Sequence, residues 1–211
     1  LMAGPALAHK AGDVIVRLGG IKVDPDASSE TFNSALPAVG GLGVDVDDDT
    51  QLGLTLAYMV TDSIGVELVG ATPFTHDILL DAGGGGVNIG ETSHLPPTLL
   101  AQYYAPQVGP MRAYVGAGLN YTLFFEDSID DAVVSPLLGG ADADVKLSNS
   151  MGFAWELGAD FALNDSWLLN VSVWNIDIDT EARLYVNDAR ADKIDVEIDP
   201  WVYMVGLGYR F

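Results

Sequence analysis

Large apolar side chains occupy every second position over the last eleven residues of the chain. The apolar positions are Trp201, Tyr203, Val205, Leu207, Tyr209 and Phe211, and the positions between them hold Val202, Met204, Gly206, Gly208 and Arg210. Successive side chains of a β-strand point to opposite faces, so the segment predicts a strand with one wholly apolar face. Aromatic residues at both ends of that face, with aliphatic ones between, are typical of a strand that crosses a bilayer in a closed barrel. An amphipathic strand of a soluble sandwich is the alternative for this strand taken alone.

The same alternation recurs along the chain, and its connections have two different lengths. Period-two segments cover residues 12–24, 49–60, 63–76, 93–104, 111–126, 147–163, 166–180 and 194–211. Short turns at 61–62, 105–110 and 164–165 alternate with long polar stretches at 25–48, 77–92, 127–146 and 181–193. Outer-membrane barrels have short periplasmic turns and long extracellular loops, whereas a sandwich has no reason to sort its connections. We therefore predict an all-β fold, an eight-stranded antiparallel transmembrane β-barrel.

The outward candidates of six strands carry no charge, and they include Leu52, Leu68, Leu99, Val115, Phe153 and Val171. Aromatic residues lie near the short turns, as at Tyr58 and Trp167, and again near the long loops, as at Tyr121 and Trp201. Two aromatic girdles with an aliphatic band between them are the pattern of a lipid-facing wall.

The first residues indicate export. Residues 1–8 resemble the end of a secretory signal peptide, with Ala6-Leu7-Ala8 as the cleavage site. We therefore expect a signal-peptide remnant at 1–8 and a single barrel domain at 9–211. The sequence has no run of eighteen apolar residues, so a transmembrane helix is not expected. The expected location is the outer membrane of a Gram-negative bacterium, where lipid, lipopolysaccharide and the outer-membrane assembly machinery are the expected partners.

The chain is strongly acidic, with 30 acidic against 9 basic residues and a formal net charge of -21. Such a chain is not expected to bind nucleic acid, because phosphate binding requires an excess of basic residues. The acids crowd into the long connections, where solvation is the simplest explanation. Bridging to lipopolysaccharide by divalent cations is the alternative.

Six charged residues fall on the predicted inward faces of the strands. They are Arg17, Glu67, Arg112, Glu156, Asp160 and Arg210. Because a single buried charge is costly, we predict that they pair in a lumen salt-bridge network.

Residues for catalysis or metal binding do not form a convincing set. His76 and Asp77 are adjacent in a strand, so their side chains point apart and do not suit a base and its orienting carboxylate. The acidic run Asp45–Asp49 differs from a calcium loop, because Thr50 replaces the turn glycine and Leu56 stands where the bidentate Glu belongs. We expect neither an enzyme nor a metal or cofactor site.

Seven segments, in order, resemble the outer membrane protein W family. Residues 49–55, 64–68, 71–74, 94–100, 114–125, 172–180 and 199–203 read DTQLGLT, IGVEL, ATPF, HLPPTLL, YVGAGLNYTLFF, SVWNIDIDT and DPWVY. The resemblance runs from about His9 to Phe211, and the long loops diverge. It implies an eight-stranded barrel that passes small, mostly hydrophobic molecules along a narrow apolar channel, which is blocked towards the periplasm and opens sideways into the bilayer. It also implies a channel constriction at Val69 and Trp174. Family members often have a larger Leu in place of Val69, so the constriction here is expected to be looser.

A lateral opening has a basis in the residues themselves. Pro96 and Pro97 lie within a predicted strand, and neither has a backbone N–H for the ladder. We therefore predict a break in the barrel wall there, and a bulge that only re-aims the strand is the alternative.

The predicted lumen lining is apolar, at Leu100, Phe124, Val202 and Met204. It suits passive uptake of a small hydrophobic solute, since a barrel of eight strands is too narrow for a wide aqueous pore. Two alternatives stay open. One is a narrow channel for small polar or cationic solutes, and the other is a structural or adhesive barrel without transport.

The terminal aromatic residue matches the C-terminal assembly signal of bacterial outer-membrane barrels. Deleting Phe211 is therefore expected to lower the fraction of protein that assembles, measured as the heat-modifiable band on gels of membrane fractions. Normal insertion of the shortened chain would refute the assignment of this residue as an assembly signal.

Overall fold

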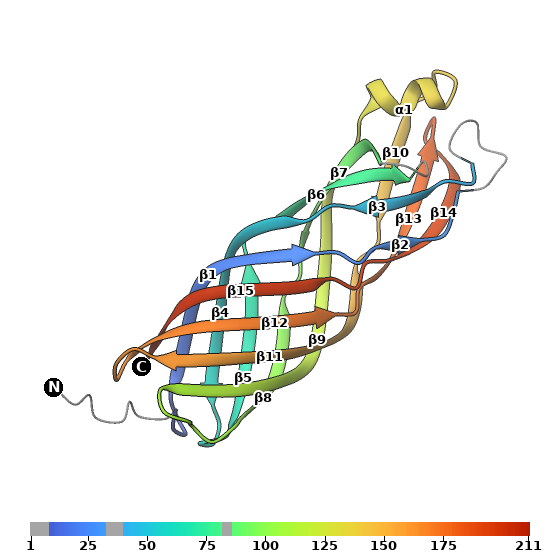
Figure 1. The fold of residues 1–211 in the computed structure, drawn as a ribbon. Helices are drawn as coiled ribbons and strands as arrows, with labels where there is room; N and C mark the ends of the chain where they lie inside the picture. The colour runs from blue at the N-terminus through green and yellow to red at the C-terminus, as the bar shows by residue number, and fades with distance from the viewer. Residues whose placement is uncertain (1–8, 33–39, 82–85) are drawn as a thin grey trace.

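The computed structural model describes residues 9–32, 40–81 and 86–211 (Figure 1). Eight antiparallel strands pair in a closed ring, in the order β1, β4, β5, β8, β9, β11, β12, β15 and back to β1. Their bounds are Val14–Asp24, Asp49–Met59, Ile64–Ala71, Thr98–Tyr104, Met111–Ile129, Ser150–Ala162, Trp167–Ile176 and Trp201–Arg210. The predicted eight-stranded antiparallel barrel is confirmed. The expected signal-peptide remnant, residues 1–8, lies outside the described residues.

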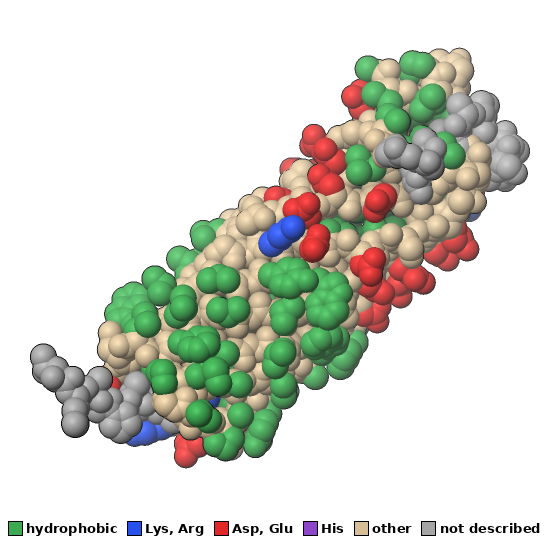
Figure 2. Space-filling view, in the orientation of Figure 1, with side chains coloured by type: hydrophobic (Ala, Val, Ile, Leu, Met, Phe, Trp, Pro, Cys, Tyr) green, Lys and Arg blue, Asp and Glu red, His purple; other side chains and the backbone are tan. Residues whose placement is uncertain are grey.

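The lipid-facing pattern is also visible on the surface. Alternate residues of β15 are exposed and buried in turn, as the sequence predicted. Figure 2 shows hydrophobic side chains gathered over the barrel, and acidic ones mainly beyond it. Aromatic pairs mark both edges of the apolar band: the ring centroids of Trp155 and Trp201 lie 5.4 Å apart, and those of Trp167 and Tyr209 lie 5.0 Å apart. Trp155 on β11 and Trp201 on β15 lie on either side of β12, and Trp167 and Tyr209 are on the adjacent strands β12 and β15, so the two pairs form parts of two girdles.

The long connections are not the polar loops that the sequence predicted. They form strands that continue the barrel beyond its upper aromatic girdle, and we call this part of the molecule the extension (Figure 1). Its strands are β2 (Ser28–Ser29), β3 (Gly43–Val46), β6 (Phe74–Asp81), β7 (Val87–Leu95), β10 (Ala143–Leu147), β13 (Asp179–Val186) and β14 (Ala189–Glu197). Strands β3, β6 and β7 pair in sequence and join β9, while β10, β13, β14 and β2 form a second sheet.

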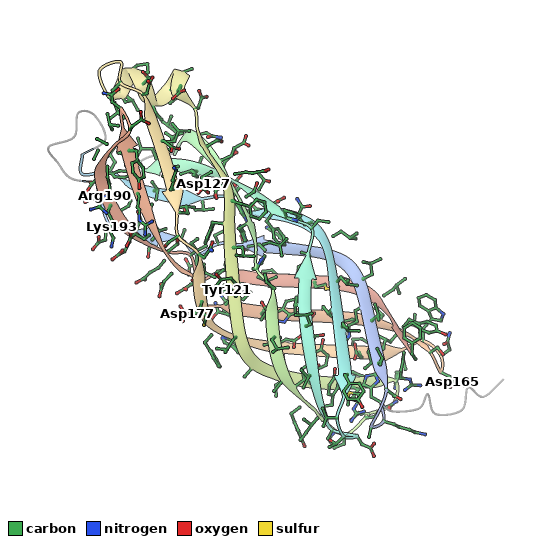
Figure 3. All side chains as sticks on the ribbon, turned by 180° about the vertical axis from the view of Figure 1, so that it is seen from behind. Tyr121, Asp127, Asp165, Asp177, Arg190 and Lys193 are labelled. Atoms are coloured by element: carbon green, nitrogen blue, oxygen red, sulfur yellow. The ribbon has the colours of Figure 1, made fainter. Side chains whose placement is uncertain are left out.

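The many acidic residues in these segments obscured the apolar inward faces of their strands in the sequence. Ile194 and Val196 of β14, and Ala182 and Leu184 of β13, are buried at alternate positions among polar neighbours. The acids therefore form the outward face of strands that also have an apolar inner face. Figure 3 shows Tyr121 at the level where the barrel passes into the extension, with Asp127 within the extension and Asp165 at the opposite end.

A short helix, α1 (Asp131–Leu137), lies at the tip of the extension. Its N-terminus is capped by Asp130, whose side chain accepts a hydrogen bond from the backbone N–H of Ala132. No helix in the described part of the chain is long and apolar enough to cross a membrane.

Candidate functional site

The extension encloses an apolar cavity, which we call the chamber. Its cavity volume is about 70 Å³. Its walls are mainly aliphatic and aromatic, including Val23, Phe32, Ile78, Phe124 and Ile178. These residues come from strands far apart in sequence that the extension brings into one ring. The chamber is therefore suited to an apolar solute of modest size.

Four aromatic rings from β6, β7 and β9 line one side of the lumen at this level. The rings of His76 and His94 are stacked, with centroids 4.8 Å apart and planes at 13°, and Phe74 stacks on His94 at 5.5 Å. Phe124 completes the set at 5.7 Å from His94. Burial lowers the pKa of His94 to about 3, with a further contribution from neighbouring His76, and burial also lowers the pKa of His76. Both rings are therefore neutral at pH 7.

Beneath the chamber, the lumen is filled by apolar side chains. Val69, Leu100, Trp174, Val202 and Met204 are all buried and belong to one apolar cluster with the chamber walls. Trp174 is 1% exposed, and its Nε1 has no hydrogen-bond partner in the described part of the chain. The structure thus brings together the two residues expected at the constriction and three of the four expected to line the lumen. The fourth, Phe124, lies higher and contributes to the chamber wall.

Below this layer, a cluster of buried charges closes the short-turn end, and we call it the floor. Arg17 is completely buried and is its central cation. Its Nη1 lies 2.7 Å from Glu67 Oε1, and its Nη2 and Nε lie 2.6 and 3.0 Å from the two carboxylate oxygens of Asp160. The side-chain amide of Gln102 donates to both Glu67 and Glu156, at 2.8 Å each. Two-point binding of a guanidinium by a carboxylate is among the stronger ion-pair geometries.

Of the two remaining arginines predicted for this network, Arg112 lies at its edge, with its guanidinium over the Tyr104 ring at 5.3 Å, whereas the prediction is wrong for Arg210. Arg112 donates to backbone carbonyl oxygens, at 2.9 Å from His9 O and 3.2 Å from Ala105 O. Arg210 pairs with Asp13, with Arg210 Nε 3.8 Å from Asp13 Oδ2, and also donates to Asp165 O. Both residues are near strand ends, so they hold the rim together instead of filling the lumen. Alternation predicted the face to which these side chains point, but not their position along the barrel axis.

The floor also contains polar side chains that the sequence analysis did not assign to it. Tyr104 OH accepts from Arg17 Nη2 at 3.0 Å and donates to Gln102 Oε1 at 2.8 Å. His9 Nε2 lies 3.0 Å from Asp160 Oδ2, and Asn170 Nδ2 donates to Asp160 Oδ1 at 2.9 Å. Inward parity was the available signal for Gln102 and Asn170, but it does not distinguish a network member from filler.

The barrel wall is interrupted at the two prolines. β7 ends at Leu95 and β8 begins at Thr98, so Pro96 and Pro97 belong to neither strand. The ladder between β5 and β8 ends at the pair Val69 and Thr98, and pairing resumes between β6 and β7 at Phe74 and His94, so the ladder lapses only between these two pairs. On the other side, Pro97 O accepts from the backbone N–H of Tyr121 at 3.0 Å. The segment is therefore held to β9 and leaves β5.

The comparisons with known proteins agree with this architecture. The sequence model of the OmpW family matches residues 10–211. The chain belongs to the outer membrane protein W family. It is 45% identical to outer membrane protein W of Vibrio cholerae over 214 residues, which cover 100% of this chain and 94% of the relative. The crystal structure of the outer membrane protein OprG from Pseudomonas aeruginosa matches with a TM-score of 0.84 at 43% identity, covering 97% of this chain and 98% of that one.

A more distant relative carries a name with a metabolic context. Dibenzothiophene metabolism operon protein PahQ of Pseudomonas aeruginosa is 27% identical over 199 residues, which cover 92% of this chain and 87% of the relative. Membership of the outer membrane protein W family places the protein in the outer membrane of a Gram-negative bacterium. The extension is then on the extracellular side and the floor on the periplasmic side, and a channel-like role is consistent with the family.

The floor leads to a prediction about stability. Replacing Arg17 with Met leaves the carboxylates of Glu67 and Asp160 buried without their cation, so we expect a loss of about 3–5 kcal/mol in the free energy of unfolding. The measurement is urea unfolding in lipid vesicles, followed by tryptophan fluorescence. Lys22→Met is the matched control, because the ion pair of Lys22 with Asp48 is solvent-exposed and its loss should leave the midpoint unchanged. An Arg17→Met variant as stable as the wild type would contradict the prediction.

The histidine pair predicts a pH dependence of the extension. The folded-state pKa of His94 is about 3, below its ordinary value of 6.5, so the unfolded state binds more protons as the pH falls. The stability of the extension should be intact above about pH 6.5 and fall by on the order of 3 kcal/mol by about pH 4. Hydrogen exchange of β6 and β7 amides at these pH values measures the loss. A His94→Phe variant, which keeps a stacking ring that does not titrate, should lose less protection, and equal losses in both proteins would contradict the assignment.

Proposed function

We propose that this barrel is a passive channel for small, mostly hydrophobic molecules, which enter the chamber from outside and leave sideways into the bilayer. The observation that carries the proposal is an apolar chamber above a floor of buried ion pairs, with a break in the wall between them. An apolar solute in the chamber meets buried charges in the direction of the periplasm. The lipid beside the wall is a more favourable environment for it.

The outer surface at the break has the form expected of an exit. Around Pro97, a hollow on the lipid-facing side is lined by Leu68, Pro97, Leu99, Leu119, Asn120, Tyr121 and Met151. Gly70 follows Val69, the last residue of β5 that pairs with β8, and a Cβ atom there would meet no heavy atom within 4 Å. Gly70 has the outward parity of Leu68, so no side chain covers the outer surface of the wall at this position.

The residues at the break also limit its energetic penalty. A gap in a barrel wall exposes backbone donors and acceptors to lipid, which is unfavourable. Pro96 and Pro97 have no N–H group to leave unpaired. The amide of Asn120 donates to Pro96 O at 3.2 Å and to Thr98 Oγ1 at 2.9 Å, which ties the segment down. The gap is therefore one that the barrel sustains in its folded state.

The distant relative supports an apolar solute. Its name connects that protein with the metabolism of dibenzothiophene, a fused aromatic molecule without strong hydrogen-bonding groups. A chamber with apolar walls fits a solute of this chemical class.

Closing the break tests the proposal. The double variant Pro96→Val with Pro97→Thr restores two backbone donors and favours pairing with β5, so uptake of naphthalene should fall to the level of protein-free vesicles. Gly70→Leu, which fills the open position from the opposite strand, should act in the same direction. Uptake is measured in vesicles whose outer leaflet contains lipopolysaccharide, with glycine uptake recorded in parallel.

Pro106→Val is the matched control, because Pro106 lies in a periplasmic turn between β8 and β9. It should leave naphthalene uptake unchanged. Heat-modified gel mobility checks that every variant folds. Naphthalene uptake that persists in both folded wall variants would refute lateral exit, and wild-type uptake equal to that of protein-free vesicles would refute transport.

A further inference from the structure

Among the described residues of the chamber wall, one side-chain polar atom that is shielded from solvent has no hydrogen-bond partner. His76 lines the chamber and is 1% exposed, and its Nε2 has no hydrogen-bond partner within the residues that the structure describes. The threonines of the lining differ from it. Thr92 Oγ1 donates to Asp127 Oδ1 at 2.7 Å, and Thr180 Oγ1 donates to Ser148 O at 2.6 Å. The hydroxyl hydrogens of both threonines are therefore engaged, and neither is available to His76.

The hydrogen bond of the other ring nitrogen, Nδ1, determines which nitrogen of His76 carries the hydrogen. His76 Nδ1 lies 2.7 Å from the backbone carbonyl oxygen of Asp47. A carbonyl oxygen can only accept, so Nδ1 carries the hydrogen, and in the neutral ring Nε2 has a free lone pair. Nε2 is also the ring nitrogen farther from the backbone of β6, and the ring belongs to the chamber wall. The chamber thus contains a buried acceptor without a donor, which is unfavourable until a donor arrives.

The surroundings of this acceptor favour a flat solute. His76 and His94 present nearly parallel rings 4.8 Å apart, and the ring of Phe74 is inclined by only 22° to that of His94. Ile78 lies two residues from His76 on the same inward face of β6 and also lines the chamber. Aromatic solutes pack well against such rings, by offset stacking or edge contacts.

We propose that His76 Nε2 is a selectivity point that accepts one hydrogen bond from the O–H or N–H group of a small, otherwise apolar aromatic solute. The inference rests on the proposed function, because it names the solutes that the chamber prefers. Naphthol-type molecules bind more tightly than hydrocarbons of the same shape. The aromatic body occupies the apolar walls, and the single donor pairs with the imidazole.

A matched pair of solutes tests this preference. In 1-methylnaphthalene, a methyl group replaces the hydroxyl of 1-naphthol, so size is nearly constant and only the donor is lost. Binding to the full chain in lipid nanodiscs is followed by the ¹⁵N resonances of the His76 ring, with empty nanodiscs correcting for partition into lipid. The wild type should bind 1-naphthol about tenfold more tightly than 1-methylnaphthalene. The Nε2 resonance should shift with 1-naphthol alone. A third solute, 1-methoxynaphthalene, has an oxygen but no donor and should behave like the hydrocarbon.

Protein variants assign the preference to one atom. His76→Phe keeps an aromatic ring, and His76→Asn keeps a donor for Asp47 O but removes the distal nitrogen. Both should bind the two solutes equally. Trp167→Phe alters an exposed ring of the periplasmic girdle, far from the chamber, and should keep the wild-type preference.

Equal binding of the two solutes by the wild type would overturn the inference, and so would a preference that survives both changes at His76. If vesicle uptake of naphthalene persists in that case, the proposed function stands and only the role of His76 fails. Absence of both binding and uptake would overturn the inference together with the proposed function.

Discussion

The structure depends on one constraint, which is that backbone groups within a bilayer must be hydrogen-bonded to one another. Eight antiparallel ladders that close on themselves satisfy it without leaving an edge. Every other feature is arranged within this ring. Charged side chains must point inward, aromatic ones collect at the two interfaces, and any break in the ladder must leave few unpaired donors. Pro96 and Pro97 meet the last condition because neither has a backbone donor, and Tyr121 and Asn120 bind their carbonyl oxygens.

Closing a small ring creates a second requirement, since the lumen of eight strands is narrow and must be filled. The chain fills it in two layers, with aliphatic and aromatic side chains above and ion pairs below. An apolar solute is compatible with the first layer and incompatible with the second. The gradient of polarity along the axis therefore opposes a direct path for such a solute at Arg17 and its carboxylate partners, which supports the proposed exit through the wall.

Side-chain alternation was sufficient to predict the barrel, because lipid imposes a face on every spanning strand. The terminal strand, with its outward Trp201 to Phe211, shows how complete this signal is. In the extension, alternation of apolar and polar positions was harder to recognise. The outer faces of its strands contact water, so they can carry acidic residues, and the apolar runs are shorter, as in β13 and β14. Alternation also contains no information on height, so it placed Arg210 in the floor although the residue ends its strand at the rim. The contacts of Tyr104 and Gln102 depend on packing across the lumen, which no local pattern records.

Transport through such a barrel requires that binding be strong enough to select a solute and weak enough to release it. A wholly apolar chamber separates solutes by size and shape, and release then depends only on partition into lipid. A single hydrogen bond contributes about 0.5–1.5 kcal/mol, which biases binding by up to about tenfold without trapping the solute. His76 is suited to this role because its Nδ1 is fixed by Asp47 and its ring is held in a stack, so forming the bond requires little reorganisation. In the proposed channel, one acceptor in an apolar wall would therefore give selectivity while leaving the proposed lateral path open.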